Sequence, residues 1–444
     1  MSAKDQQEPL LGEGAHPQEE EQPGETRDVE SQPRQNAASA AGVSVMFTTF
    51  IMLGDMLGLG SLTLPSVFAR LGWIPALIVV IVCGFGTMYS GRLFALLATK
   101  VSNARVFDDF GGAAMGAWGR RFTYVTVYAT ILAEPIIFHL TSMEALQQIF
   151  YGSGITPIFA AIVVAAVMIP LSQIQGIEEV SAVSVIGSVG MVWALAVIAV
   201  KLCLTPKVDN YVPTALFPER SFSDAPDILV AVFDTVFTFG GQVNWVRYLM
   251  SMQHKRKFPI AVANVSAVME VMYIMIGCVG YYRLGSDFDK SKPVTSVLPQ
   301  DIWTSLANVG LLAHCIVAYM INLNVWTHLV IHLIKPSKQR EDSDGEQRSS
   351  RGAWAVTSVI GIALSGVISV SVPFFDVIVA AIGALGDLAA AYALPALFVL
   401  VLMGSHLPRW ERILCSVLIP LTLLLSVVGI GSSVASLVSK VKQH

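Results

Sequence analysis

The fold of this 444-residue chain is decided by an apolar segment that is interrupted midway, at Gly54-Asp55-Met56-Leu57-Gly58-Leu59-Gly60-Ser61-Leu62-Thr63-Leu64-Pro65. The sixth apolar run is interrupted in the same manner, at Phe237-Thr238-Phe239-Gly240-Gly241-Gln242-Val243-Asn244. Both stretches place glycines and polar side chains where a membrane-crossing helix is uniformly apolar. Unpaired backbone is tolerated in lipid only where protein or a water-filled cavity shields it. We therefore predict two broken membrane helices, at corresponding positions in two halves of the chain.

The composition is that of a membrane protein rather than a soluble one. Hydrophobic residues make up 54% of the chain, charged residues only 14%, and the mean hydropathy is +0.63. Soluble domains carry about a quarter of charged residues, and a membrane span needs about 20 mostly apolar residues. We therefore expect an all-α membrane protein in contact with a lipid bilayer. The net charge of −4, without a basic face, gives no reason to expect a nucleic-acid partner.

The apolar runs predict about eleven transmembrane helices in one domain over residues 43–438. The expected spans are 43–68, 72–98, 122–150, 156–172, 180–204, 227–252, 258–284, 301–334, 353–372, 376–403 and 411–438. Loop lysines and arginines are about twice as numerous on one side of the membrane as on the other, which predicts a cytoplasmic N-terminus. Two hydrophilic segments are expected on that side, a disordered tail over residues 1–42 and a flexible loop over residues 335–351.

The interruption of the first span carries the sharpest candidates for chemistry. Asp55 is a charge within the bilayer, where charges are costly and mark substrate or ion pathways. It could bind a cation, take up a proton or meet a substrate ammonium group, or it could only cap the second half-helix. Freed backbone amides at Gly58, Gly60 and Ser61 form a half-helix N-terminus, which suits the carboxylate of an amino acid. Glycines in such a helix also permit close packing.

The interruption of the sixth span offers acceptors for the opposite charge. Asp234 and Thr238 are four residues apart and share a helix face. Carbonyl groups freed around Phe239, Gly240 and Gly241 would receive an ammonium group, together with Thr238 or Asp234. Unwound backbone at matching positions of two halves is typical of a transporter's binding site. The two interruptions therefore predict the two halves of one substrate site.

Several other polar residues lie within predicted spans. Glu134 precedes Pro135, which is expected to kink or break its helix. Glu134 is the second candidate for a proton carrier, alone or in a relay with His139, and His139 by itself is interpreted as structural. The remaining candidates, for proton or ion chemistry or for helix packing only, are Glu270, Asp387, Asn322 and Asn324.

Metal binding is not expected. His328 and His332 have the spacing of a metal-binding pair, but the sequence places no third ligand near them. The five cysteines lie within apolar runs and form no Cys-x-x-Cys pair. We interpret them as small hydrophobic residues.

The chain resembles the amino acid/auxin permease family in motifs that include both interruptions. One motif is Gly58-Leu59-Gly60-Ser61-Leu62-Thr63-Leu64-Pro65, followed by Phe68-Ala69-Arg70-Leu71-Gly72-Trp73. Another is Phe237-Thr238-Phe239-Gly240-Gly241-Gln242, followed by Phe258-Pro259 and Gly280-Tyr281-Tyr282-Arg283-Leu284-Gly285. A third, in the tenth span, is Pro373-Phe374-Phe375 with Ile382-Gly383-Ala384-Leu385-Gly386. The similarity covers essentially residues 40–436.

The resemblance implies a LeuT-like fold, with spans 1–5 and 6–10 as inverted repeats, and secondary transport of amino acids. Two positions depart from the family pattern. Gln242 replaces a histidine after the glycines of span 6. Gly54-Asp55 replaces an Asn or Thr, and is nearest to the acidic position of fungal neutral amino acid permeases. The lost Asn weakens a sodium site and the gained Asp favours protons, although sodium coupling stays open.

These observations predict a proton-coupled symporter of amino acids, neutral ones being favoured, that works by alternating access with Asp55 as the proton carrier. No cofactor is expected, and the chain has no motif of an intramembrane enzyme. The alternative function is a sensor that binds amino acids with little or no transport. Asp5-Gln6-Gln7-Glu8-Pro9-Leu10-Leu11 resembles an acidic dileucine signal. Such a signal binds sorting adaptors and favours a vacuolar or lysosomal membrane over the plasma membrane.

Overall fold

The computed structural model describes residues 43–104, 106–175, 177–207, 211–219, 221–334, 340–341, 347–348, 350–372 and 374–443. They belong to one compact unit of the chain. The predicted disordered tail with its Leu10-Leu11 motif lies outside the described residues, as does most of the predicted loop over residues 335–351. What the sequence predicts for these segments stays a prediction.

The unit is built from helices and one short antiparallel pair of strands, β1 (Arg340–Glu341) and β2 (Gln347–Arg348). The helices are, in chain order, α2 (Val45–Met56), η1 (Leu59–Thr63), α3 (Leu64–Leu71), α4 (Trp73–Lys100), α5 (Phe107–Ile149), α6 (Pro157–Leu171), α7 (Ile177–Leu204), η2 (Phe222–Asp224), α8 (Ala225–Thr238), η3 (Gln242–Asn244), α9 (Trp245–Ser251), η4 (Lys255–Lys257), α10 (Phe258–Leu284), α11 (Val294–Val297), α12 (Ile302–Ile334), α13 (Arg351–Ser371), α14 (Phe375–Ile382), η5 (Gly383–Asp387), η6 (Ala389–Ala393), α15 (Leu394–Met403), η7 (Gly404–His406) and α16 (Arg409–Gln443).

The predicted all-α membrane architecture is confirmed. Among the described residues, nine helical segments are long and apolar enough to cross a membrane. The pair formed by α2 and by η1 with α3, bent by 53° at its break, adds a tenth. The shorter apolar helix α6 lies where the sequence predicts the fourth span. The order of these segments along the chain is that of the predicted spans.

The break in the first span follows from its glycines and its proline. Between α2 and η1, Gly58 has extended backbone angles, with φ −138° and ψ −155°. Pro65 lies in the first turn of α3, where its missing N–H removes no helical hydrogen bond. α3 ends at Gly72, whose φ of +83° favours glycine. One apolar run is thereby divided into two half-helices.

The break in the sixth span depends on Gly241. Its φ of +115° places the backbone between α8 and η3 in the left-handed region, which glycine adopts without strain. A Cβ atom at Gly241 would also lie 2.8 Å from Cγ of Met56 in α2. Glycine therefore both turns the chain and lets the two broken spans touch.

The third span differs from its prediction in two respects. α5 begins at Phe107, well before the predicted start at residue 122, and its backbone is non-helical at Met115 and at Gly116, where φ is +65°. Pro135 does not break its helix, since helical backbone angles continue through this residue. Neighbouring helices can hold a proline-containing membrane helix in shape, and the kink that was the other expectation stays a prediction.

The tenth span contains two π-helical turns, Gly383–Asp387 and Ala389–Ala393, that the sequence did not predict. Turns of this kind occur frequently at functional sites. A Cβ atom at Gly383 would lie 2.5 Å from the carbonyl oxygen of Phe233 in α8, and one at Gly386 would overlap the Thr130 side chain of α5. These glycines let the tenth span lie directly against the third and sixth.

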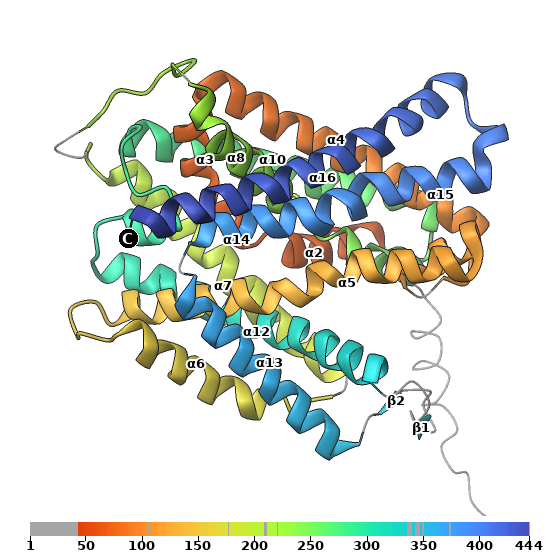
Figure 1. Ribbon diagram of the computed structural model, residues 1–444, viewed down its shortest axis with the longest axis horizontal. Helices are drawn as coiled ribbons and strands as arrows, with labels where there is room; N and C mark the ends of the chain where they lie inside the picture. Colours follow the sequence, from red (N-terminus) through yellow and green to blue (C-terminus); the bar gives the residue numbers. More distant parts are fainter. Residues whose placement is uncertain are drawn as a thin grey trace, which may run out of the picture. The chain divides into compact units, whose positions relative to one another are not determined.

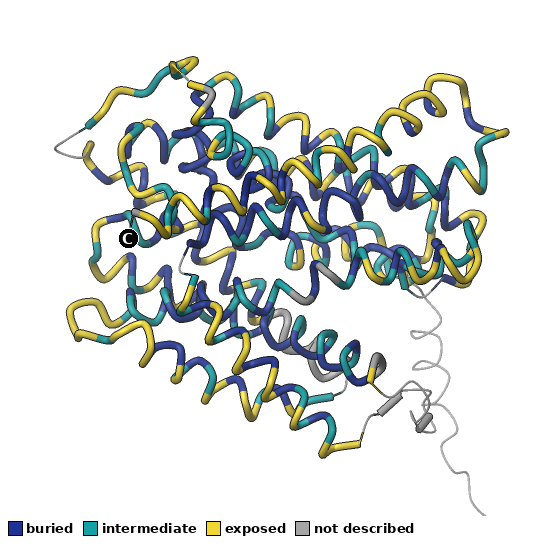
Figure 2. Tube along the Cα trace, in the orientation of Figure 1, coloured by how far each residue is buried: buried dark blue, intermediate teal, exposed yellow. Residues whose placement is uncertain are grey.

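The helices form a layered bundle in which the broken spans are interior. In Figure 1, α14, α15 and α16 run above α5, while α6, α12 and α13 form a group below it. α12 packs on α5 and α7, and α14 and α16 pack on α8. Figure 2 shows exposed residues along the outward sides of α4, α6, α13 and α16. Phe85, Ile162, Val367 and Val427 are among them, as expected for helix faces in contact with lipid.

Candidate functional site

The two broken spans are joined by backbone hydrogen bonds where the first begins and the sixth ends. The N–H of Val43 donates to the carbonyl of Ser251 (2.8 Å), and the N–H of Gln253 donates to the carbonyl of Val43 (3.1 Å). We name this side of the unit the inner end, and the opposite side, where α3 ends, the outer end. The bridge holds α2 against the segment that follows α9.

Tyr273 of α10 joins the two breaks at their centre. Its hydroxyl donates to the carbonyl of Thr238 (3.0 Å) and lies 3.5 Å from the carbonyl oxygen of Met56. The buried ring packs edge-on against Phe239, with centroids 5.2 Å apart. The hydroxyl of Tyr273 thus contacts backbone carbonyl groups at both interruptions.

The predicted carboxylate site in the first span packs on the break of the sixth. A Cβ atom at Gly60 would lie 2.6 Å from Cα of Thr238. The N–H and the Oγ of Ser61 both donate to the carbonyl of Gly58, at 3.1 and 2.8 Å. The first amides of a helix have no partner within that helix. The backbone from Gly58 to Gly60 can therefore donate to an anion at the start of η1.

Asp55 lies at the inner side of the break in the sixth span. The side-chain amide of Asn244 donates to both carboxylate oxygens of Asp55 at 3.3 Å. Arg247 interacts with this carboxylate electrostatically. The side chain of Asp55 is exposed, and η1 begins without a side-chain cap. Asp55 is therefore not the cap of the second half-helix, which was its alternative interpretation.

A pocket begins beside the break of the sixth span and extends toward the inner end. It is lined by side chains of α5, η3, α9, α12 and η5, among them Tyr128, Glu134, Arg247, Asn322 and Asp387. The backbone of Gly241 also reaches the pocket. The structure thus brings Glu134, the second predicted proton carrier, to the same cavity as the unwound backbone.

Asp387 is the most buried acidic group of this pocket. Its residue surface is only 4% exposed, and its Oδ2 atom has no hydrogen-bond partner among the described residues. A Cβ atom at Gly240 would lie 3.0 Å from this oxygen, and Glu134 interacts with Asp387 electrostatically. A carboxyl group of the tenth span therefore stands next to the break of the sixth.

Asp234 faces a different set of residues. It is fully buried, and its Oδ2 lies 3.6 Å from Nη1 of Arg70 in α3. Nη2 of Arg70 donates to Oδ2 of Asp376 at 2.5 Å, and Nζ of Lys440 lies 2.6 Å from the same oxygen. These four residues are named the Arg70 cluster. The structure thus places Asp234 in an ion-pair cluster at the outer end, one turn of α8 away from Thr238.

The Arg70 cluster joins the first, sixth, tenth and eleventh spans at the outer end. Its two basic and two acidic groups balance in charge. Several of its buried polar atoms have no hydrogen-bond partner among the described residues, namely Nε and Nη1 of Arg70, both carboxylate oxygens of Asp234 and Oδ1 of Asp376. The cluster occupies the outer side of the broken spans, opposite to the pocket.

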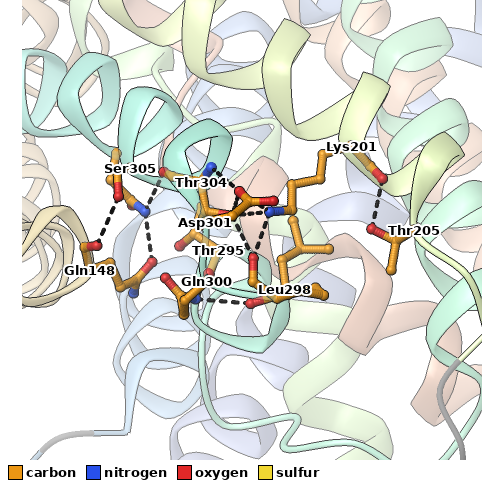
Figure 3. A network of polar contacts seen from close by, with 11 residues as sticks. Gln148, Lys201, Thr205, Thr295, Leu298, Gln300, Asp301, Thr304 and Ser305 are labelled. Carbon is orange, nitrogen blue, oxygen red and sulfur yellow. Dashed lines mark hydrogen bonds and ion pairs between the residues drawn. The ribbon is translucent and has the colours of Figure 1, made fainter. Parts of the chain in front are cut away.

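A second charged network, shown in Figure 3, lies between α7 and α12. Nζ of Lys201 donates to the carbonyl of Pro299 (2.6 Å) and to side-chain oxygens of Asp301 and Thr304 (both 2.5 Å). Asp301 caps α12 by accepting from the N–H of Thr304 (3.0 Å). The hydrogen bond from Lys201 lowers the pKa of Asp301 below its usual range. All three ammonium hydrogens of Lys201 thus have acceptors.

The same network continues to α5 through amide groups. Asn308 donates to Oε1 of Gln148 (2.9 Å), and the side-chain amide of Gln148 donates to Ser296 (2.5 Å). Figure 3 shows Gln148 and Ser305 facing each other across α5 and α12. The residues Gln148, Lys201, Asp301, Thr304 and Asn308 are named the Lys201 network.

The other polar candidates of the sequence pack between helices. His139 contacts the hydroxyl of Tyr319 (3.1 Å) and the carbonyl of Ala161 (3.3 Å). These contacts occupy both ring nitrogens, so the proposed relay with Glu134 is not formed. Asn324 donates to the carbonyl of Ile174 (3.0 Å), which is a bond between helices.

His328, which was considered for a metal-binding pair, and the cysteines have the following neighbours in the described part of the chain. His328 packs edge-on against Trp354, with centroids 4.6 Å apart, and the side chain of His332 lies outside the described residues. In the described ranges no three His, Cys, Asp or Glu side chains are grouped to hold a metal ion. The five cysteines are free, and Cys203 is exposed.

Two interrupted helices in contact, with a pocket at their breaks, are the arrangement of a LeuT-like fold. The fold is similar to that of MhsT in complex with L-phenylalanine, with a TM-score of 0.54 and 15% identity over 87% of this chain and 98% of that one. The family described as "Transmembrane amino acid transporter protein" matches residues 41–439, and the chain belongs to this family. It is a family of transporters and not of enzymes.

Two relatives show the breadth of the similarity. Amino acid transporter ANT1 of Arabidopsis thaliana is 21% identical over 388 residues, which cover 83% of this chain and 87% of the relative. Vacuolar amino acid transporter 4 of Saccharomyces cerevisiae is 24% identical over 256 residues, which cover 56% of this chain and 35% of the relative. The resemblance inferred from the motifs is thereby confirmed.

Sequence reasoning missed Tyr273 and the Arg70 cluster. Arg70 and Lys440 lie near the ends of predicted spans, where the sequence shows a basic residue but not its partner. Asp376 begins the tenth span and looks like a helix-capping residue. The available signal was the presence of charged residues at the outer ends of several predicted spans. The sequence does not show which of these residues form ion pairs with one another.

Proposed function

We propose that this chain is a secondary active transporter that moves amino acids by alternating access, with protons as the coupling ion. Membership of the family supports amino acids as the substrate. The observation that carries the mechanism is the pocket at the two breaks, with a buried ion-pair cluster on its outer side. No cofactor takes part in this proposal.

The difference between the two ends supports alternating access. At the outer end the Arg70 cluster is buried and joins both broken spans to the tenth and eleventh. At the inner end Asp55 and Arg247 are exposed beside the pocket. This arrangement fits a conformation open to one side, and opening to the other side would separate Arg70 from its acidic partners.

The substrate would bind through its amino acid head group. Its carboxylate would accept from the amides around Gly58 and Gly60, beside Ser61. Its ammonium group would donate to the carbonyls around Phe239, Gly240 and Gly241, next to Thr238. The neutral side chain favoured by the sequence stays a prediction.

Asp55 is proposed as the carrier of the coupling proton. It is exposed at the inner end and accepts from Asn244 of the other broken span. Protonation would remove the charge that holds the Asn244 amide and so weaken a contact between the two breaks. Glu134 in the pocket wall is the second candidate, and a sodium ion is the alternative coupling ion.

A vacuolar or lysosomal membrane is proposed as the location, with the N-terminus in the cytoplasm. The dileucine motif at Leu10-Leu11, read by sorting adaptors, supports it, as does the name of the yeast vacuolar relative. The excess of basic loop residues on one side supports the orientation.

The test is uptake of labelled amino acids into proteoliposomes with and without an imposed pH gradient. We expect accumulation that needs the gradient and is abolished by a protonophore. Asp55→Asn should abolish accumulation while exchange of internal for external substrate continues. The matched control is Glu219→Gln, which changes an exposed loop carboxylate and should leave accumulation unchanged.

Each of the other possible results would assign a different proton carrier, a different coupling ion or a different function. Accumulation by Asp55→Asn against a gradient would assign the proton to another group, with Glu134→Gln as the next variant. Flux that ignores pH but requires sodium would replace the coupling ion. Substrate binding without flux would establish the sensor function instead.

A further inference from the structure

We propose that the pocket recognises a cationic side chain, so that the substrate is an amino acid with a second amino group or a guanidino group. The inference rests on the proposed function, because it assigns a substrate class to the same site. It begins with Asp387, which lines the pocket, is 4% exposed and has an Oδ2 atom without a partner in the described part of the chain. A buried carboxylate in that condition is costly unless a cation or a proton meets it.

The charges that face the pocket do not balance. Its acidic lining residues are Asp108, Glu134 and Asp387. Among the described lining residues the basic one is Arg247, which interacts with Asp55 beside the pocket. Asp108 has Arg120 as a basic neighbour, with Nε at 3.9 Å. The two deeper carboxyl groups are left over, since the charged group that acts on Glu134 is Asp55 and the one that acts on Asp387 is Glu134, both acidic.

The head group of an amino acid does not account for these two carboxyl groups. The amides near Gly58 and the carbonyls near Gly240 already provide for one negative and one positive charge. Asp387 stands just beyond them, because its Oδ2 lies 3.0 Å from the position of a Cβ atom at Gly240. A side chain that passes Gly240 into the pocket would therefore meet Asp387 first and Glu134 next.

Two uncharged polar residues of the lining suit a group with several N–H donors, while most of the other lining residues are apolar. Tyr128 and Asn322 line the same cavity with a hydroxyl and an amide oxygen, which accept hydrogen bonds without adding charge. An ammonium or guanidinium group carries only donors and a positive charge. A neutral aliphatic side chain would leave both carboxyl groups without a partner. The pocket thus favours a cationic substrate over the neutral one that the sequence suggests.

The test compares arginine with citrulline, which has nearly the same shape but a neutral ureido group. In proteoliposomes we expect the wild type to prefer arginine by about tenfold or more, as the loss of a charged hydrogen bond implies. Asp387→Asn keeps the side-chain shape and removes its charge, so the preference should fall to about onefold to threefold. Glu219→Gln is the control, because Glu219 is an exposed loop residue outside the pocket lining. Its arginine preference should equal that of the wild type.

Every result separates this inference from the proposed function. Transport of neutral amino acids with arginine rejected would overturn the inference and leave the transporter intact, whereas no flux of any amino acid would overturn both. An Asp387→Asn variant that loses arginine and citrulline equally would show a proton, a sodium ion or the common ammonium group at Asp387, and would overturn the inference. If Asp387→Asn does not fold, the ratio of arginine to citrulline transport by the wild type decides, and a ratio of one or less would overturn the inference. In that case Glu134→Gln replaces Asp387→Asn as the variant that removes a charge from the pocket.

Discussion

The Arg70 cluster and the Lys201 network both place charged side chains at the outer end of this transporter, yet they are built differently. In the Lys201 network three acceptor oxygens lie within 2.6 Å of Nζ of Lys201, one for each ammonium hydrogen. Asp301 is half exposed to solvent. In the Arg70 cluster the guanidinium and both carboxylates are buried, and several of their atoms have no hydrogen-bond partner in the described chain. The charged pair of the Lys201 network is thus hydrogen-bonded where it stands, although Oδ1 of Asn308 has no partner in the described chain. The charged groups of the Arg70 cluster are not fully hydrogen-bonded.

The elements that the two networks join explain this difference. The Lys201 network connects α5, α7 and α12 and touches neither broken span. The Arg70 cluster connects α3 and α8, which are halves of the broken spans, with α14 and α16. Buried polar groups without partners are rare and call for an explanation. We interpret the Lys201 network as a fixed brace and the Arg70 cluster as a closure that must open during transport.

The largest expected effect comes from breaking the closure. Arg70→Met leaves Asp234 and Asp376 buried without the guanidinium, which costs about 3–5 kcal/mol for a buried pair that loses one partner. Thermal unfolding in detergent measures the change. Arg120→Met is the matched control, because Arg120 is 57% exposed and its pairs with acidic residues are worth about 0–1 kcal/mol. Equal losses in the two variants would remove the distinction between buried and exposed pairs.

A large loss of transport is expected where the moving spans touch. Gly60→Ala places a Cβ atom 2.6 Å from Cα of Thr238, and backbone cannot yield as a flexible side chain can. Displacing a site by about 1 Å costs up to about a hundredfold in rate, so uptake should fall at least tenfold while the protein still elutes as a folded species. Gly431→Ala in α16 is the control, since no atom lies within 4 Å of the added carbon. Normal uptake by Gly60→Ala would show that the breaks need not stay in contact.

An intermediate effect is expected from breaking the brace. Lys201→Met removes a charged donor and should lower the unfolding free energy by about 1–3 kcal/mol, with transport per folded molecule unchanged. The pKa of Asp301 is lowered by Lys201, so this stabilisation is present above the ordinary Asp pKa of about 4 and is lost as pH falls through the lowered value.

The difference in melting temperature between wild type and Lys201→Met should therefore shrink below about pH 4. Lys442→Met, an exposed lysine near the end of α16, controls for the loss of a positive charge. A Lys201→Met variant that is stable but unable to transport would place the Lys201 network among the moving parts.

The smallest effect is expected at the centre of the breaks. Tyr273→Phe keeps the ring against Phe239 and removes one hydroxyl, which should cost about 1 kcal/mol. Melting temperature reports the loss, and Tyr282→Phe, on a half-exposed ring of the same helix, serves as the comparison. A loss as large as that of Arg70→Met would make Tyr273, rather than the Arg70 cluster, the main tie between the broken spans.

Much of the fold could be predicted because its causes are local. Long apolar runs define the spans, and Gly58, Pro65 and Gly241 stand at the interruptions of the two broken spans. The π-helical turns of the tenth span could not be predicted in this way. These turns depend on how closely Gly383 and Gly386 approach α8 and α5. The sequence of the tenth span gives no information on these distances to other helices.

The backbone part of the candidate site could also be predicted. The breaks bring Gly60 against Thr238 and Gly241 against Met56, as their matching positions in two halves implied. The neighbours of the acidic side chains could not be predicted in this way. Asp234 shares a helix face with Thr238 but lies beside Arg70, while Asp387 stands free next to Gly240.

By itself, the sequence determined a helical membrane protein with two interrupted spans, since hydrophobic length and the conformational freedom of glycine act within a few residues. Its motifs, through their family resemblance, implied amino acid transport. Only the tertiary structure decided which charges are paired and which face the pocket. Arg70 meets Asp376 across 306 positions of the chain, and such a pair forms only when four spans pack at one end. The Oδ2 atom of Asp387 has no hydrogen-bond partner in the described chain. Whether a buried carboxyl group finds a partner depends on all the helices packed around it, which the local sequence does not specify.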